Sequence, residues 1–221
     1  MNYKGNEIKA FIFDLDGTLI DTERIYRMIW PKAVAHMGYV FTDEMYLSLR
    51  SLGRPYAPLR FKEWFGDDFD YDMARRIRKG YFDKYINEHG IDIKKGAIEL
   101  LEELKSQQII TAIATATDVK RATEYMEMTG LNGYFDRLIS ATMVDEGKPS
   151  PKVYRYACEQ LGLKPSECFA VEDAPNGIKS ASAAGMNVIM VPDQSEPDCE
   201  LEGLYDICVD SLDEIIALLN E

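Results

Sequence analysis

The sequence predicts an α/β protein in which helices cover both faces of a parallel sheet and a small helical domain follows the first strand. Three observations predict this fold class. An apolar run near the N-terminus ends abruptly in two acidic residues, residues 22–89 carry helical signals without a convincing strand, and apolar strands then alternate with amphipathic helices. The chain has 221 residues, of which 46% are hydrophobic, enough for a sizeable core.

The first strand is expected at residues 10–13, an apolar run that is followed by Asp14 and Asp16. Side chains two residues apart on extended backbone point to the same side, and Gly17 lets the chain turn away sharply. Two carboxylates at the end of a buried strand are costly unless a cation or hydrogen-bond donors compensate them. An all-oxygen ligand set suits Mg²⁺, although solvated acids in an ordinary turn would explain the same pattern.

The inserted segment is predicted to form four helices, because potential N-caps and terminal glycines divide it into residues 23–37, 42–52, 56–65 and 70–88. Thr22 is the expected N-cap of the first helix, and Pro31 is expected to kink or break it. The tryptophans Trp30 and Trp64 are expected in the core of this domain. A basic cluster on the fourth helix is expected to form a solvated helix face: Arg75, Arg76, Arg78 and Lys79.

The remainder of the chain reads as alternating helices and strands. The expected helices are residues 96–107, 118–129, 151–161, 176–184 and 211–219. The expected strands are residues 109–115, 138–140, 168–171, 188–191 and 207–209. In parallel sheets of this kind the ligand sits beyond the carboxyl ends of the strands, so the residues that follow each strand are the candidate site.

Three further polar groups fall at strand ends or in loops. Thr115 and Ala116 end one strand and precede a helix, where a hydroxyl and backbone amides suit a phosphate oxygen. Glu172 and Asp173 form a second acidic pair at another strand end. Lys148 lies between glycine and proline residues just before a helix, where it would neutralise a phosphate and a carboxylate. Taken singly, these residues are also explained as a helix cap, a solvated pair and a surface lysine.

Composition narrows the function classes. The formal net charge of −13 argues against nucleic acid or an anionic membrane surface as a partner. No apolar run approaches the ~20 residues that span a bilayer, and residues 1–9 have no apolar signal core, so we expect a cytoplasmic protein. Four cysteines without Cys-x-x-Cys spacing are expected to be reduced. Only two histidines are present, which argues against a zinc site or a histidine triad.

The order of the four groups, Asp14/Asp16, Thr115, Lys148 and Glu172/Asp173, resembles the haloacid dehalogenase superfamily, whose motifs are Asp-x-Asp-Gly-Thr, a Ser/Thr after a strand, a Lys and an acidic pair. The stretches Gly147–Pro151 and Val171–Gly177 are similar to its β-phosphoglucomutase-like branch. The resemblance covers the whole chain. It implies a Rossmann-like catalytic core at 1–21 and 90–221 and a helical cap domain at 22–89.

The resemblance also implies an activity. A Mg²⁺-dependent phosphatase of small phosphomonoesters, with sugar phosphates foremost, would use Asp14 as the nucleophile that forms an aspartyl phosphate and Asp16 as general acid and base. Asp14, the backbone carbonyl of Asp16, and Asp173 would hold the metal. Glu172 would either be a further ligand or lie directly behind the ligands. Thr115, Ala116 and Lys148 would bind the phosphoryl group. An acid at position 16 favours phosphoryl transfer, since the dehalogenases lack it.

Two alternatives stay open. One is a β-phosphoglucomutase-type phosphosugar mutase, but such enzymes carry a histidine where this chain has Tyr26, about twelve residues after the nucleophile. The other is a catalytically silent binding protein on the same fold. Arg54, Arg50 and Tyr26 are candidate substrate contacts from the cap. The expected partner is a small phosphorylated metabolite, and the expected assembly is a monomer or small homo-oligomer.

Overall fold

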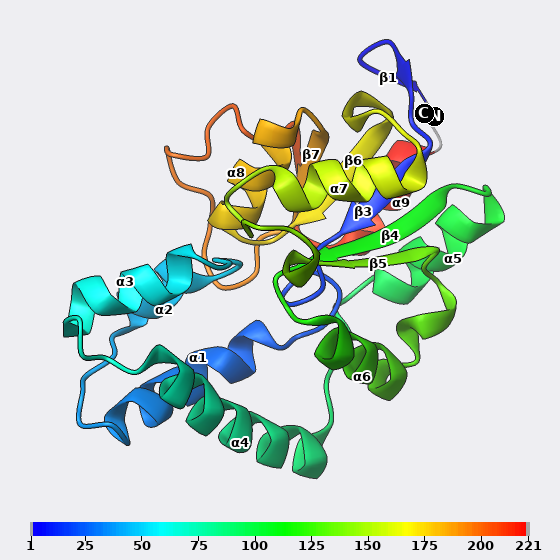
Figure 1. Cartoon of the computed structure of the whole chain (residues 1–221). Helices are drawn as coiled ribbons and strands as arrows, with labels where there is room; N and C mark the ends of the chain where they lie inside the picture. The colour runs from blue at the N-terminus through cyan, green and yellow to red at the C-terminus, as the bar shows by residue number, and fades with distance from the viewer. Residues whose placement is uncertain (1, 220–221) are drawn as a thin grey trace.

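The sheet confirms the predicted fold class. The computed structural model describes residues 2–219, and its main sheet has six parallel strands in the order β5-β4-β3-β6-β7-β8 (Figure 1). The strands are β3 (Ala10–Phe13), β4 (Ile110–Thr115), β5 (Arg137–Ser140), β6 (Cys168–Glu172), β7 (Asn187–Met190) and β8 (Ile207–Cys208). Because β3 is central and pairs with both β4 and β6, the residues that follow these three strands meet at one edge.

Helices cover both faces of the sheet, as the alternation of β3 requires. Phe11 and Phe13 face one hydrophobic cluster, which includes residues of α5 (Ala97–Ser106), α6 (Val119–Thr129) and α9 (Ile215–Leu219). Ala10 and Ile12 face the other cluster, which includes residues of α7 (Lys152–Leu161) and α8 (Pro175–Ala184). Both faces of β3 are therefore buried, which explains why its sequence is a continuous apolar run.

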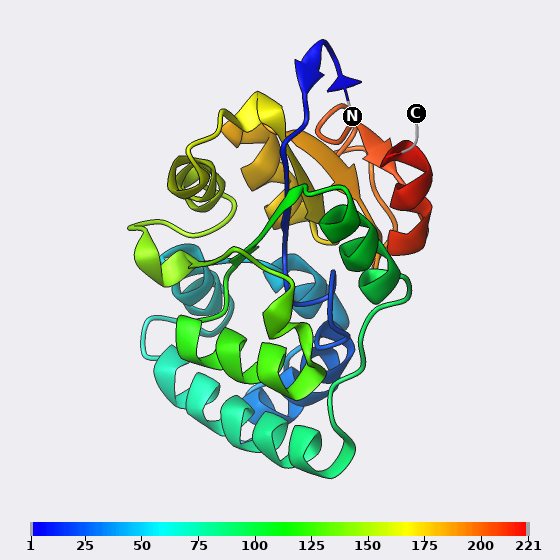
Figure 2. The same ribbon diagram turned by 90° about the vertical axis from the view of Figure 1, so that its right-hand side faces the viewer.

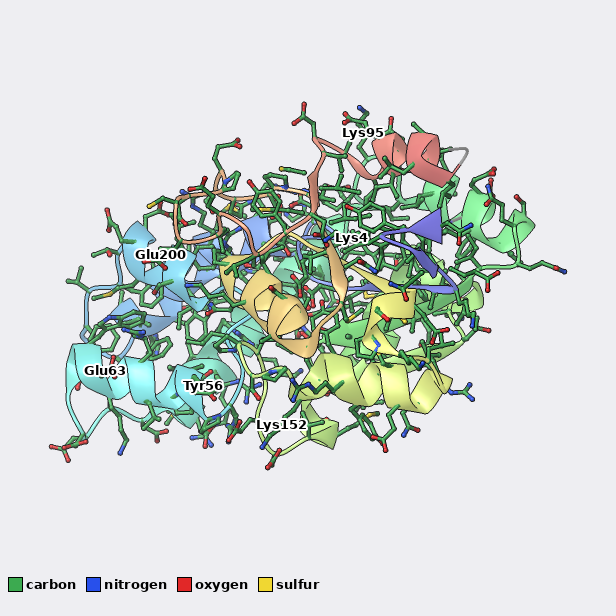
Figure 3. The ribbon with its side chains drawn as sticks, turned by 90° about the horizontal axis from the view of Figure 1, so that it is seen from above. Lys4, Tyr56, Glu63, Lys95, Lys152 and Glu200 are labelled. Atoms are coloured by element: carbon green, nitrogen blue, oxygen red, sulfur yellow. The ribbon has the colours of Figure 1, made fainter. Side chains whose placement is uncertain are left out.

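The inserted segment contains four helices that lie together beyond the carboxyl edge of the sheet (Figure 1): α1 (Glu23–Ala35), α2 (Asp43–Leu49), α3 (Tyr56–Phe65) and α4 (Tyr71–His89). They share an apolar cluster of their own, in which Trp30 is buried and Trp64 packs at the margin. We propose that residues 22–89 act as a cap module on a core made of 1–21 and 90–221. Seen from above, Tyr56 and Glu63 of α3 lie at one end of the molecule, well away from Lys95 of the core (Figure 3).

Two local expectations for α1 are not met. Pro31 does not break the helix, because packing against α4 supports both halves around the missing backbone N–H. Thr22 makes no side-chain cap; its hydroxyl donates to Asp16 at 2.6 Å instead. The predicted C-terminal helix is also shorter, since residues 212–214 form a 3₁₀ turn before α9.

The N-terminal residues form an antiparallel hairpin that the sequence did not predict, β1 (Asn2–Tyr3) with β2 (Asn6–Glu7). Its turn residues, Lys4 and Gly5, both have positive φ, as the favoured two-residue hairpin turns require. The hairpin lies at the opposite end of the sheet from helices α1–α4 (Figure 2). Within residues 2–219, no helix has both the length and the apolar character that crossing a membrane demands.

Candidate active site

A buried ion cluster lies where β3 and β6 end. Lys148 is fully buried, and its Nζ lies 2.6 Å from Asp14 Oδ1 and 2.6 Å from Glu172 Oε1. The same ammonium group donates to the carbonyl of Ala114 at 2.8 Å, so its three donors are all used. Lys148 reaches the cluster from the loop before α7, as the sequence predicted from its flanking glycine and prolines. The three predicted residues Asp14, Lys148 and Glu172 thus come together.

The charges of this cluster do not balance. Burial raises the pKa of Asp14 well above its usual value; Lys148 opposes the shift, while Glu172 and Asp16 add to it. Burial also raises the pKa of Asp173, and the neighbouring Glu172 and Asp14 raise it further, although Arg50 works against them. The pKa of Lys148 is raised because the two adjacent carboxylates outweigh its burial. Lys148 and Arg50 together do not balance Asp14, Asp16, Glu172 and Asp173, so the site favours a further cation.

The acidic residues fit a divalent metal. Asp14, Glu172 and Asp173 each offer a carboxylate oxygen, and these oxygens all lie within 4.8 Å of one another. Glu172 Oε2 and Asp173 Oδ2 are buried without any hydrogen-bond partner in the described part of the chain. Buried carboxylate oxygens without donors are costly, and a hard cation such as Mg²⁺ would satisfy them. The carboxylate of Asp16 is not part of this group.

Asp16 is held by two hydroxyl groups at the mouth of the site. Thr22 donates to Asp16 Oδ1 at 2.6 Å, and Thr117 donates to Asp16 Oδ2 at 2.7 Å. The two aspartates predicted from the Asp-x-Asp spacing therefore have different surroundings. Asp14 is ion-paired and faces the acidic cluster, whereas Asp16 has neutral partners that fix its orientation. Such a division suits one carboxylate for attack and the other for proton transfer.

The predicted phosphate-binding residues line the space in front of Asp14. Thr115 is fully buried at the end of β4, and its hydroxyl oxygen accepts the backbone N–H of Thr117 at 3.0 Å. Because that contact uses an oxygen lone pair, the hydroxyl proton is free to donate. Ala116 follows at the start of the loop before α6 and lines the same cavity. Their positions agree with a role at phosphate oxygens.

Close packing explains two glycines of the motifs. A Cβ on Gly17, whose φ is +86°, would lie 2.5 Å from Asp173 Oδ2. A Cβ on Gly177 would lie 2.1 Å from the carboxyl atoms of Glu172. Both distances are too short for any side chain, so these glycines are needed to admit the acidic pair.

Arg50 is a buried residue of the cap that contacts the core. It is buried, and its guanidinium Nη1 lies 3.6 Å from Asp173 Oδ2 while Nη2 contacts the hydroxyl of Ser195. Nε and Nη1 have no hydrogen-bond partner within residues 2–219. The side chain of Asn176 holds the backbone of this segment by donating to the carbonyls of Ser48 and Arg50, at 3.2 and 2.8 Å. Two unused donors of a buried arginine are well placed for an anion.

A cavity of about 700 Å³ joins the cap to the catalytic residues, and its lining includes Asp14, Asp16 and Thr115 together with all three predicted cap contacts. Tyr26 forms a hydrogen bond with the core, since its hydroxyl lies 2.8 Å from that of Tyr125. Burial raises the pKa of Tyr26 to about 12. Arg54 is largely exposed and pairs with Asp72 at 2.6 Å. Arg50 and Tyr26 are thus fixed by the core, whereas Arg54 lies at the rim.

Sequence reasoning missed three buried partners of the site. Tyr154 of α7 donates to Glu172 Oε1 at 2.6 Å, beside Lys148. Glu23 is buried at the start of α1, and the hydroxyl of Tyr46 contacts its carboxylate. Burial raises the pKa of Glu23 to about 7, since the hydrogen bond from Tyr46 only partly offsets it. No local sequence signal marks these residues, because their partners lie far along the chain.

Comparisons with known proteins identify the family of this chain. The family model for haloacid dehalogenase-like hydrolases matches residues 8–185. Hexitol phosphatase A of Escherichia coli is 31% identical, over 91% of this chain and 94% of its own. The crystal structure of CbbY from Rhodobacter sphaeroides in complex with phosphate has a TM-score of 0.78 at 28% identity, covering 94% of this chain and 96% of its own. The structure of β-phosphoglucomutase from Clostridium difficile has a TM-score of 0.80 at 27% identity, covering 94% and 93%.

The matched region includes every candidate residue of the catalytic core, from Asp14 to Asp173, and the whole inserted helical segment. Its extent exceeds half of the chain, and the relatives above align over nearly their full lengths. The chain belongs to the haloacid dehalogenase-like hydrolases.

Proposed function

We propose that this protein is a phosphatase of small phosphomonoesters, and of sugar phosphates in particular. The observation that carries the proposal is the pair of unlike aspartates at the end of β3, Asp14 beside Lys148 and Asp16 between two hydroxyls. Hexitol phosphatase A and the fructose-1-phosphate phosphatase YqaB of Escherichia coli, 31% and 25% identical to this chain, support sugar phosphates as the substrate class.

Asp14 is the proposed nucleophile. One of its oxygens would attack phosphorus and form an aspartyl phosphate as the bond to the leaving oxygen breaks. Its ion pair with Lys148 opposes the rise in pKa that burial causes and fixes the direction of the carboxylate. The hydroxyl of Thr115, with the backbone at Ala116, would hold the transferring phosphoryl oxygens. Lys148, whose donors are engaged, would neutralise the phosphate through its charge. Positioning and charge neutralisation of this kind are the main requirements of phosphoryl transfer.

Asp16 is the proposed general acid and base. It would protonate the leaving alcohol oxygen and then take a proton from the water that hydrolyses the aspartyl phosphate. Thr22 and Thr117 keep its carboxyl group directed at the cavity rather than at the acidic cluster. Because Thr22 lies at the junction of core and cap, this contact links the orientation of Asp16 to the position of α1.

Asp14, Asp173 and Glu172, with the backbone carbonyl of Asp16, are the proposed ligands of Mg²⁺. The ion would supply positive charge against the phosphoryl oxygens when bound. Asp173 is held for this role by Thr18, which donates to Oδ1 at 3.1 Å and leaves Oδ2 without a donor.

The alternative is a phosphosugar mutase, and the structural similarity to β-phosphoglucomutase supports it as a second candidate. Tyr26 argues against it. This tyrosine occupies the place of the mutase histidine, and its raised pKa keeps the hydroxyl neutral and bonded to Tyr125 at neutral pH. A mutase would return the phosphoryl group to sugar, so inorganic phosphate would not accumulate.

The test is phosphate release from a panel of phosphosugars, measured with Mg²⁺ and with chelator. Asp14→Asn should abolish release, and Asp68→Asn, at an exposed position of the cap, is the matched control. Release that needs Mg²⁺ and disappears only in Asp14→Asn supports the proposal. No release from any substrate, together with isomerisation of glucose 1-phosphate, would replace the phosphatase with the mutase.

A further inference from the structure

The wall of the cavity formed by α4 carries positive charge that no carboxylate of residues 2–219 neutralises. Arg75 and Arg78 are half-buried, line the cavity and form no ion pair within these residues. The neighbouring acids are already engaged: Asp72 pairs with Arg54 at 2.6 Å, and Asp83 pairs with Lys79 at 2.6 Å and with Arg121. In a protein with a net charge of −13, unpaired arginines at a cavity are an unexpected surplus.

The guanidinium of Arg78 lies over two aromatic rings. Its guanidinium carbon lies 4.7 Å from the ring centre of Tyr26 and 4.7 Å from that of Trp30. A cation–π contact uses the charge of a guanidinium and none of its N–H donors, so the donors stay available for an anion. Nε of Arg78 is buried and has no acceptor in the described chain. The aromatic rings thus orient a planar donor group that has no protein partner for one of its donors.

The helical spacing adds a second cation to this group. Arg75 precedes Arg78 by three residues on α4, so the two side chains leave the same face of the helix. Arg75 contacts the ring of Tyr71 at 6.0 Å, and Tyr71 also lines the cavity. The sequence predicted a solvated helix face for this cluster. Instead, packing of α4 against α1 turns Arg75 and Arg78 toward the cavity that contains Asp14 and Asp16.

We propose that Arg78, with Arg75, forms a second anion subsite, so that the preferred substrate is a phosphomonoester carrying an additional phosphate or carboxylate. The inference rests on the proposed phosphatase function. Asp14 would receive the phosphoryl group that is transferred, and the edge of the Arg78 guanidinium would donate hydrogen bonds to two oxygens of the other anion. Tyr26, which is in contact with Arg78, lines the same cavity as Asp14 and Asp16.

The first measurement compares matched substrates that differ in the second anion. Fructose 1,6-bisphosphate is paired with fructose 1-phosphate, and 6-phosphogluconate with glucose 6-phosphate. We expect the second anion to raise kcat/KM of the wild type by about tenfold or more, mainly through KM, as charge-assisted hydrogen bonds do. Which pair shows the larger ratio distinguishes a phosphate from a carboxylate.

Variants then separate the subsite from a packing role. In Arg78→Gln, the ratio of kcat/KM with and without the second anion should fall to within about twofold of one. Arg78→Lys should restore the ratio partly, because the charge returns without the planar guanidinium fork. Arg60→Gln is the matched control; Arg60 belongs to the cap helix α3, pairs with Glu63 and lies outside the cavity lining. If Arg78 only packs between its rings, Arg78→Gln will lower the melting temperature and leave the ratio unchanged, which overturns the proposal.

A binding experiment keeps the two proposals distinguishable. In the Asp14→Asn background, calorimetry should give about tenfold tighter binding of fructose 1,6-bisphosphate than of fructose 1-phosphate, and Arg78→Gln should remove the difference. If no phosphate is released by the wild type but this difference is found, the subsite stands and the phosphatase proposal fails. If phosphate is released and neither ratio depends on Arg78, the phosphatase proposal stands and the subsite fails.

Discussion

The backbones of Gly53 in the cap and Gly147 in the core approach each other closely, and replacing Gly53 by alanine tests whether that contact is required for turnover. The backbone N–H of Gly53 donates to the carbonyl of Lys148 at 2.8 Å, and that of Gly147 donates to the carbonyl of Arg54 at 2.8 Å. A Cβ on Gly53 would lie 2.7 Å from Gly147 Cα. The φ of Gly53 is not positive, so alanine tests the contact and not backbone strain.

The magnitude follows from the two hydrogen bonds. With the methyl group of alanine at position 53, the backbones at Gly53 and Gly147 cannot stay this close. Both backbone hydrogen bonds are therefore lost when the two segments separate. At about 1 kcal/mol each, the closed arrangement is weakened by about 2 kcal/mol relative to an open one. Since about 1.4 kcal/mol corresponds to a factor of ten, kcat/KM should fall about 30-fold if turnover requires closure. Lys148 supplies one of the acceptors, so the separation reaches the catalytic cluster directly.

The assay is phosphate release with fructose 1-phosphate, accompanied by small-angle X-ray scattering to detect separation of cap and core. Gly80→Ala is the matched control, because a Cβ at Gly80 of α4 would meet nothing within 4 Å and alanine favours the helix. The reasoning is refuted if Gly53→Ala keeps the wild-type kcat/KM, or if Gly80→Ala is impaired to the same degree.

Three further predictions concern the acidic residues. Asp16→Asn should lower kcat for phosphate release by about 10²- to 10⁴-fold, the range typical of general acid–base groups. The affinity for a phosphosugar, measured by calorimetry, should change little. Equal losses of kcat and affinity would contradict the role of Asp16 as general acid and base. Saturating Mg²⁺ at about 100 times its Kd should stabilise the wild type by about 3 kcal/mol in urea unfolding. Asp173→Asn should lose this gain, because the substitution removes a proposed metal ligand; an unchanged gain would contradict that role. The pKa of Glu23 is raised from 4.5 to about 7, so its contribution to stability is full below pH 4.5 and is lost as the pH rises through 7. In chelator, the free energy of unfolding of Glu23→Gln should therefore fall by about 3 kcal/mol less than that of the wild type between pH 4.5 and 8. Parallel pH profiles of the two proteins would show that the Glu23 carboxyl does not titrate in this way.

Local patterns were sufficient wherever the physical cause was local. The apolar run 10–13 predicted β3 because a strand buried on both faces must be apolar throughout, and α3 begins and ends where its sequence signals indicate. Polar residues after β3, β4 and β6 predicted the site, because parallel strands bring their carboxyl ends to one edge.

Long-range packing decided what these patterns left open. Thr22 was predicted to cap α1 and instead orients Asp16, a choice that depends on where the hydroxyl finds its best acceptor. Arg50 and Arg78 carry the same side chain, yet one is buried against Asp173 and the other is held between two rings. A sequence window cannot separate these environments, since each is built from residues dozens of positions away.

By itself, the sequence determined the fold class and the order of the core motifs, because hydrophobic period and strand-end polarity are properties of short segments. Only the tertiary structure decided which charges are compensated. Burial, and not residue type, left the oxygens of Glu172 and Asp173 without donors and the arginines of α4 without carboxylates. Those imbalances arise where cap and core meet, since the energy of a buried charge depends on every group around it.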